Sequence, residues 1–322
     1  MNYIIFGGSG FIGTHLINLL KEENTEAIIY NLDIIENNHN GKSNFIFCDV
    51  RNPIGINFPV TKNDVIFNFS AIHITPGHQD YEYFETNILG AENITIFAEE
   101  FKIEKILFTS SIAPYGASES IKKETSLPMP NTPYGISKLV AEKIHIAWQN
   151  KNQHNKQLTI LRPGVVFGKG ENGNFTRLYW GIKERKFFYP GRRDTIKSSI
   201  YVKELVGFML YRINLDIYNF ELYNCVYTPA LSIEQIANTI IKTTNLNRNI
   251  FTIPGWILKS AAGIIGFFGG KKLGIHPDRV KKLIISTNVS GEKLAKSGYQ
   301  FKYSFEEAIT DWFIDNDKKY LK

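Results

Sequence analysis

The chain has 322 residues, of which 43% are hydrophobic and 21% are charged. This composition is typical of a globular protein with one large domain or two joined ones, and it excludes intrinsic disorder, collagen and coiled coil. The net charge of +6 comes from cations spread along the chain, without a basic block. It therefore favours an anionic small molecule over nucleic acid as the ligand.

Short apolar runs alternate with amphipathic segments of helical length through the first half of the chain. The runs cover residues 3–6, 27–32, 45–48, 65–69, 105–109 and 158–161, and the predicted helices cover 12–22, 83–101 and 134–151. Continuous apolar runs are typical of parallel strands that are buried on both faces. Their alternation with helices predicts an α/β fold with a doubly wound parallel sheet.

The alternation ends at about residue 165. A loop-rich stretch at 168–174 is followed by predicted helices at 202–211 and from 233, an apolar run at 221–225 and an amphipathic segment at 305–313. We expect residues 1–165 to form the sheet domain and residues 166–322 to form mainly a smaller lobe. Part of 196–230 is expected to return to the sheet domain.

The sequence also bears on location. Cys48 and Cys225 are too few for a disulfide framework or a zinc site, and the amino terminus lacks the basic region and cleavage site of a signal peptide. We therefore expect a cytoplasmic protein without a metal. The apolar stretch 256–268 is interrupted by Lys259 and is shorter than the ~20 residues that span a membrane. It predicts a buried helix rather than stable membrane insertion, and a peripheral membrane contact helped by Lys271 and Lys272 is the alternative.

Gly7, Gly10 and Gly13 form a glycine fingerprint directly after the first predicted strand, at the start of the first helix. Gly7 permits a tight turn, Gly10 lets a pyrophosphate approach the backbone, and Gly13 lets the helix pack closely on the strand. The free amides and the helix dipole at this point attract a diphosphate. The fingerprint therefore predicts dinucleotide binding, with an ordinary glycine-rich turn as the alternative.

Asp33 closes the second predicted strand, where a carboxylate accepts hydrogen bonds from the ribose hydroxyls of adenosine. The same carboxylate would repel a 2′-phosphate, and Ile34 and Ile35 provide no cation to neutralise one. Asp33 therefore favours NAD over NADP, unless it is only a turn residue.

Tyr134 and Lys138 lie one helical turn apart and share one helix face. An ammonium beside a phenol stabilises the phenolate and lowers the pKa of the phenol, so Tyr134 is a candidate general base toward an alcohol. Ser111 follows the fifth predicted strand, and loops at the carboxyl ends of parallel strands form the ligand crevice. Its hydroxyl is placed to hold the substrate oxygen against Tyr134. Taken alone, the Tyr134–Lys138 pair is also typical of a contact on a helix surface, and Ser111 is also typical of a turn.

Together these motifs resemble the extended short-chain dehydrogenases/reductases, in particular the nucleotide-sugar epimerases, dehydrogenases and reductases. The resemblance rests on GGSGFIG (7–13), Asp49-Val50, TSSIAPYG (109–116), YGISK (134–138), LRPGVVFG (161–168), SSIYVKEL (198–205) and the segment 293–313. It covers essentially the whole chain. It implies a Rossmann-type sheet domain, a substrate-binding lobe and a homodimer that packs segments 83–101 and 134–151 against a second copy.

The resemblance also implies residue roles. The cofactor-binding set would be Gly7, Gly10, Phe11, Ile12, Gly13, Asp33, Asp49, Val50, Phe69, Ser70, Ala71, Asn87, Tyr134 and Lys138. Asp49 and Val50 would flank the adenine, and Asn87 would lie beneath the cofactor. Ser111, Tyr134 and Lys138 match the catalytic residues of the family.

Departures from the family pattern concern the substrate. Ile112-Ala113 replace the Asp-Glu pair of the dehydratases, Val165 replaces an Asn common in epimerases, and Lys197 replaces a diphosphate-binding Arg. Lys197 keeps the positive charge but is a point charge rather than a bidentate fork. The aromatic and basic stretch 174–197 suits the diphosphate and base of a nucleotide sugar, and Lys197 and Arg193 are its candidate substrate contacts.

We therefore expect NAD-dependent oxidation of a hydroxyl, at C4, of a nucleotide-activated sugar used for surface polysaccharides. The enzyme would be a 4-dehydrogenase or a 4-epimerase, and a 4-keto-sugar reductase is the alternative. The non-enzymatic alternative is a nucleotide-sensing regulator of the same fold. Such a protein would be expected to lack Tyr134 or Lys138.

Overall fold

The computed structural model describes residues 1–37, 39–74, 77–215, 217–254 and 284–322. Across these residues the main feature is a parallel sheet of seven strands in the order β11-β7-β5-β4-β1-β2-β3. The strands are β1 (Asn2–Phe6), β2 (Ile28–Asp33), β3 (Asn44–Phe47), β4 (Val65–Asn68), β5 (Lys105–Thr109), β7 (Gln157–Pro163) and β11 (Phe220–Cys225). All strands are parallel, and the order in which they are added to the sheet reverses between β1 and β4, so the doubly wound prediction is confirmed.

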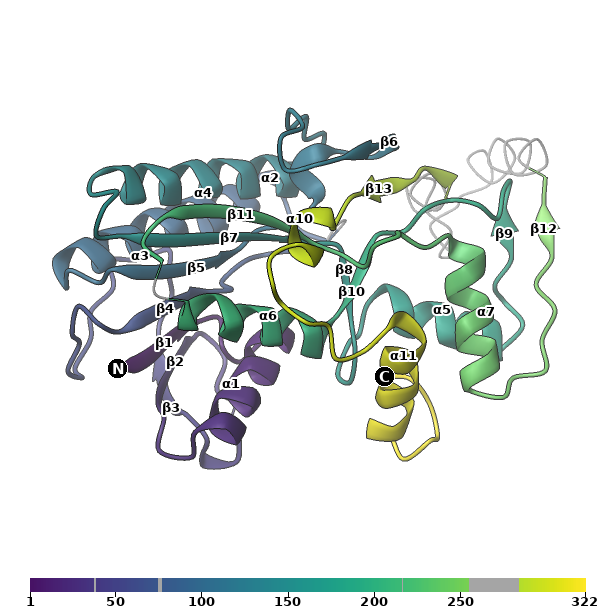
Figure 1. Ribbon diagram of the computed structural model, residues 1–322, viewed down its shortest axis with the longest axis horizontal. Helices are drawn as coiled ribbons and strands as arrows, with labels where there is room; N and C mark the ends of the chain where they lie inside the picture. Colours follow the sequence, from purple (N-terminus) through teal and green to yellow (C-terminus); the bar gives the residue numbers. More distant parts are fainter. Residues whose placement is uncertain (38, 75–76, 216, 255–283) are drawn as a thin grey trace.

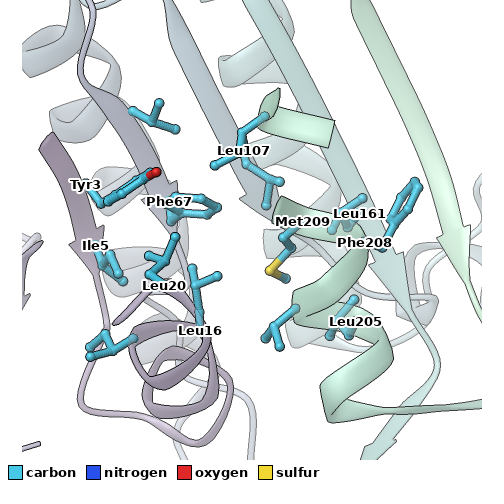
Figure 2. Close-up of a cluster of buried hydrophobic side chains, with 14 of the residues drawn as sticks. Tyr3, Ile5, Leu16, Leu20, Phe67, Leu107, Leu161, Leu205, Phe208 and Met209 are labelled. Carbon is cyan, nitrogen blue, oxygen red and sulfur yellow. The ribbon is translucent and has the colours of Figure 1, made fainter. Parts of the chain in front are cut away.

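Helices cover both faces of the sheet (Figure 1). One face carries α1 (Phe11–Glu23) and α6 (Val202–Asn214), which pack against each other. Figure 2 shows the core on this side, where Leu16 and Leu20 of α1 and Met209 of α6 pack with Phe67 and Leu161 of the strands. The other face carries α2 (Asp80–Phe84), the π-helical turn η2 (Glu85–Leu89), α3 (Gly90–Glu100) and α4 (Pro133–Asn150). Burial on both faces explains why the strands read as continuous apolar runs.

The remaining elements lie beyond the carboxyl ends of the strands. A separate hydrophobic cluster joins α5 (Asn174–Lys183), α7 (Ile233–Thr243) and α11 (Phe305–Asp315) around Phe167 and Trp312. Three short strand pairs complete this part: β8 (Val165–Phe167) with β10 (Ser199–Tyr201), β9 (Tyr189–Pro190) with β12 (Thr252–Ile253), and β6 (Ser118–Lys122) with β13 (Thr287–Val289). Together these elements form the lobe beside the sheet (Figure 1). Three shorter elements contact the sheet domain: η1 (His39–Gly41) contacts α1, η3 (Ala113–Tyr115) contacts α4, and α10 (Glu292–Ala295) contacts β11.

The segment 196–230 contributes to both parts, because β10 begins it beside β8 whereas α6 and β11 belong to the sheet. The stretch 256–268, with Lys271 and Lys272, lies outside the described residues. Among the helices that are described, none combines the length and the apolar character needed to cross a membrane.

Candidate active site

The turn between β1 and α1 requires glycine at two positions. Gly7 has a φ of +77°, which L side chains rarely adopt, and a Cβ on it would lie 2.8 Å from the backbone nitrogen of Ser70. A Cβ on Gly13 would lie 2.5 Å from the Cα of Gly8. The glycines therefore bring α1, the turn and the segment after β4 into direct contact, as the fingerprint predicts.

The N-terminus of α1 fits an anionic group. Its N-cap is Gly10, no side chain caps the helix, and its first turn, which includes Phe11 and Ile12, has no acidic residue. The first amides of a helix have no partner within it and lie at the positive end of its dipole. This arrangement fits the diphosphate of NAD, which Gly10 and the amides of Phe11, Ile12 and Gly13 would hold.

Asp33 lies at the carboxyl end of β2 beside the glycine turn. Its carboxylate accepts hydrogen bonds from the amides of Ser9 (3.0 Å) and Ile35 (3.1 Å). These bonds hold the carboxylate at the edge where a ribose would lie. Val50 packs against Gly90, while Asp49 is partly buried and forms an ion pair with Arg51, which lowers the pKa of the Asp49 carboxyl group.

The segment that follows β4 is tied to the sheet and to α4. Phe69 continues from β4 by donating to the carbonyl of Phe6 (2.8 Å), and the amide of Ser70 donates to the side chain of Asn68 (3.1 Å). Asn87 is buried, and its side-chain amide pairs with both backbone groups of Ile72, the residue after Ala71 (2.9 and 3.1 Å). Asn87 also donates to Ser137 of α4 (2.8 Å), so this side chain fixes the segment expected to line the cofactor.

Tyr134 stands at the first turn of α4, where the side chain of Thr132 caps the helix by accepting from Gly135 (3.1 Å). Ser111 lies two residues after the end of β5, and its side chain interacts with Tyr134. Burial raises the pKa of Tyr134, and the bond to Ser111 lowers it in part. The structure thus brings together the two hydroxyl groups that the sequence predicts at the reaction centre.

Lys138 follows Tyr134 by one turn and is 2% exposed. Its Nζ donates to the carbonyl of Thr109 (2.6 Å) and lies 4.3 Å from the centre of the Phe108 ring. Burial lowers the pKa of Lys138 to about 7, although the carboxylate of Glu142 raises it. The expected lowering of the Tyr134 pKa by Lys138 is not what this structure shows, because burial dominates at Tyr134 and the ammonium is directed at Thr109.

The buried carboxylate of Glu142, which lies on the same face of α4, is not predicted from the sequence. Glu142 is 1% exposed and accepts from Ser110 Oγ (2.5 Å), Arg162 Nε (2.8 Å) and Arg162 Nη2 (2.5 Å). The signal that could have found it is spacing, because Tyr134, Lys138 and Glu142 follow one another at single-turn intervals.

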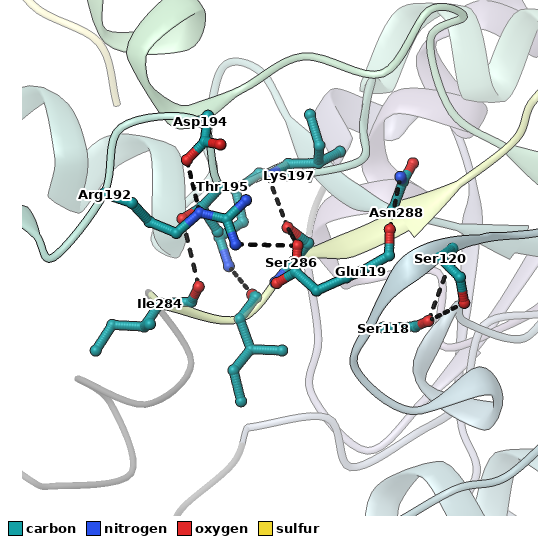
Figure 3. A network of polar contacts seen from close by, with 12 residues as sticks. Ser118, Glu119, Ser120, Arg192, Asp194, Thr195, Lys197, Ile284, Ser286 and Asn288 are labelled. Carbon is teal, nitrogen blue, oxygen red and sulfur yellow. Dashed lines mark hydrogen bonds and ion pairs between the residues drawn. The ribbon is translucent and has the colours of Figure 1, made fainter.

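The predicted substrate cations lie in the lobe and have partners within it. Lys197 donates to the carbonyl of Ile285 (2.8 Å), and burial lowers its pKa to about 8. Figure 3 shows it beside a network in which Glu119 binds Arg192 (3.1 Å) and Ser286. Arg193 donates to Thr252 (2.6 Å) and pairs with Glu234 (3.1 Å) on the surface. No contact joins either cation to Ser111 or Tyr134 in the described hydrogen bonds.

Comparisons with known proteins agree with this arrangement. Residues 3–225 match the model of the NAD dependent epimerase/dehydratase family. The chain is 29% identical over 316 residues, 96% of its own length and 93% of the relative's, to an N-acetyl-alpha-D-glucosaminyl-diphospho-ditrans,octacis-undecaprenol 4-epimerase of Escherichia coli O157:H7. It is 28% identical over 244 residues to a GDP-6-deoxy-D-talose 4-dehydrogenase of Aggregatibacter actinomycetemcomitans, covering 73% of this chain and 78% of that protein.

A solved structure confirms the fold. The UDP-N-acetylglucosamine 4-epimerase from Methanobrevibacter ruminantium M1, in complex with UDP-N-acetylmuramic acid, superposes with a TM-score of 0.75 at 20% identity. The match covers 98% of each chain. The lobe beyond the sheet therefore shares the architecture as well as the sheet itself.

Proposed function

Because the chain belongs to the NAD-dependent epimerase/dehydratase family, we propose that it oxidises a hydroxyl, at C4, of a nucleotide-activated sugar used in surface-polysaccharide synthesis. The observation that carries this proposal is that the side chain of Ser111 interacts with Tyr134, with Lys138 one turn further along the same helix. Relatives named as a 4-epimerase and a 4-dehydrogenase support the C4 position.

In the proposed reaction, some residues orient the substrate and others transfer the proton. Ser111 holds the substrate oxygen, and Tyr134 removes its proton as the hydroxyl carbon is oxidised. Lys138 donates to the end of β5 and supplies positive charge near the phenol. NAD, when bound, supplies the hydride acceptor, and the glycine turn, Asp33 and the segment fixed by Asn87 would hold it.

We also assign the diphosphate of the substrate to the lobe. Residues 166–322 are mainly the substrate-binding lobe and residues 1–165 the dinucleotide-binding domain, which α6 and β11 complete. Lys197 is the first candidate contact because it is held in a fixed position. Arg193 is the second, and it would have to leave Thr252 and Glu234 to reach a diphosphate.

A lipid-linked sugar is the second candidate substrate. The E. coli relative, which covers 96% of this chain, is named for a sugar joined through a diphosphate to undecaprenol. A nucleotide sugar and a polyprenol-linked sugar share the sugar diphosphate, so the same oxidation applies to both. Assays with both substrate classes separate the two candidates. Net reduction of NAD indicates a dehydrogenase, net oxidation of NADH indicates a 4-keto-sugar reductase, and no net change indicates an epimerase. In either case we place the enzyme in the cytoplasm, where activated sugars are made.

Tyr134→Phe tests the chemistry. We expect kcat to fall by roughly 10²–10⁴-fold because the general base is lost, while NAD still binds. The measurement is turnover of sugar diphosphates by purified protein, with NAD affinity measured in parallel. Tyr81→Phe is the matched control, because Tyr81 is 59% exposed. Unchanged turnover in Tyr134→Phe would remove this residue from the mechanism.

A further inference from the structure

Three consecutive residues at the end of β5 each interact with a different side chain of one face of α4. Lys138 donates to the carbonyl of Thr109 (2.6 Å), Ser110 donates to Glu142 (2.5 Å), and the side chain of Ser111 interacts with Tyr134. Tyr134 and Lys138 already have roles in the proposed reaction. Glu142 has none, yet it binds the residue between the other two contacts.

Glu142 is costly to bury. A carboxylate that is 1% exposed loses its hydration, and the cost is offset only when every lone pair finds a donor. Arg162 of β7 supplies two of these donors, and its guanidinium lies 4.6 Å from the centre of the Tyr115 ring. Tyr115 in turn donates to Asn224 of β11 (2.9 Å), so Arg162 is held from both sides.

Neutralising Arg162 does not account for the whole arrangement. The same Oε1 atom that accepts from Arg162 also accepts from Ser110, the residue before Ser111. The carboxylate also lies one turn beyond Lys138 and acts on it through charge. Glu142 therefore lies close to both parts of the proposed reaction centre, the segment after β5 that contains Ser111 and the α4 face that carries Lys138.

The geometry points to Glu142 as a positioning residue of the proposed reaction: it holds Ser110, and through it Ser111, against α4, with its carboxylate one helical turn from Lys138. The inference rests on the proposed function for the roles of Ser111 and Tyr134. The charged and titratable groups around Lys138 are Tyr134, Glu142 and His145 of α4 and His73 after β4. Of the two histidines and Glu142, only the carboxylate favours the charged lysine.

Glu142→Gln separates the charge from the shape. Loss of the carboxylate lowers the pKa of Lys138 further, since Glu142 raises it. The ammonium is then lost at lower pH, so the alkaline limb of the kcat profile moves to lower pH. We expect kcat at neutral pH to fall at least about tenfold with NAD affinity unchanged. A wild-type profile in this variant would overturn the proposal.

The double variant Glu142→Gln/Arg162→Met distinguishes positioning from simple neutralisation, and it removes the unpaired guanidinium that could unfold the single variant. We expect its alkaline limb to remain displaced. If Glu142 only neutralises Arg162, the second substitution restores the profile and the proposal fails. Ser110→Ala tests the link to β5 alone: kcat should fall while the limb stays in place, and an unchanged kcat would overturn that part.

A titration without substrate separates this inference from the proposed function. The titration of Lys138 is followed by NMR of isotope-labelled lysine side chains, and its signal is assigned with a Lys138→Met chain. Because Glu142 raises the pKa of Lys138, the ammonium should be lost at lower pH in Glu142→Gln than in the wild type. No shift overturns the role of Glu142. Absence of sugar turnover in the wild type would instead count against the proposed function.

Discussion

His145 illustrates at residue scale how burial fixes a protonation state. It lies in the middle of α4, stacks on Phe108 at 4.2 Å between ring centres, and is fully buried. Its Nδ1 lies 2.8 Å from the carbonyl of Ala141 and must carry the proton, so its Nε2 accepts from the amide of Asn68 (3.3 Å). Burial lowers the pKa of His145 to about 4, and it stays neutral under ordinary conditions.

This depressed pKa predicts an acid-dependent loss of stability. The stabilisation is complete above the ordinary histidine pKa of 6.5 and is lost as the pH falls toward about 4, because the unfolded chain takes up the proton first. The loss amounts to at most ~3.5 kcal/mol at ~1.4 kcal/mol per pKa unit. Urea unfolding between pH 7 and 4 measures it. In His145→Phe the slope should flatten, whereas His154→Gln, at an exposed histidine, should keep the wild-type slope.

The residues predicted from the sequence are those with a local signature. Gly7, Gly13, Ser111, Tyr134 and Lys138 follow from motif spacing, and the structure brings Ser111 and Tyr134 into contact. The Glu142–Arg162 pair joins α4 to the next strand, β7, and the sequence pattern does not show that these two side chains meet. The pKa values of Tyr134 and Lys138 depend on burial in three dimensions, and for that reason the simple expectation of an acidified phenol fails.

At the scale of elements, the strand and helix boundaries follow the sequence closely where apolar periodicity is strong. The predicted helix 83–101 is continuous in the structure but contains the π-helical turn η2, which includes Asn87. Such turns often occur at functional sites. The pairing of β6 with β13 joins segments far apart in the sequence, and their short, polar strands give no periodic signal.

The β1–α1 turn gives a prediction at this scale. Gly13→Ala places a Cβ 2.5 Å from Gly8, so the helix must move away from the turn that holds the diphosphate. We expect the dissociation constant for NAD to rise at least about tenfold, or ~1.4 kcal/mol. Calorimetric titration with NAD provides the measurement. Gly55→Ala is the control because a Cβ there meets no atom within 4 Å, and equal affinities in the two variants would contradict the prediction.

At the scale of the whole molecule, one helical face lacks a partner within the described chain. Leu89 and Ile96 beside α4, and Ile136 and Val140 on it, remain between 36% and 56% exposed, and α3 packs against α4. Together with the resemblance, these side chains favour a homodimer in which this face meets its copy.

Ile96→Glu tests that assembly, because a carboxylate in an apolar helix contact would remain without a partner. We expect the variant to sediment as a monomer while the wild type sediments as a dimer. Ile314→Glu on α11, at a site 52% exposed, should leave the wild-type mass unchanged. A monomeric wild type would refute the proposed dimer.

The position of β11 has a consequence for how the protein is made. β7 is buried along its whole length, yet the strand that pairs with its outer edge, β11, is encoded some sixty residues later, after the chain has passed through the lobe. During synthesis, the edge of β7 therefore remains unpaired and exposed until β11 has been made, and an exposed apolar edge strand is prone to aggregation. A chain that ends at residue 165 would lack β11, and the edge of β7 would stay exposed. The two parts therefore have different roles, but residues 1–165 need the later segment in order to fold.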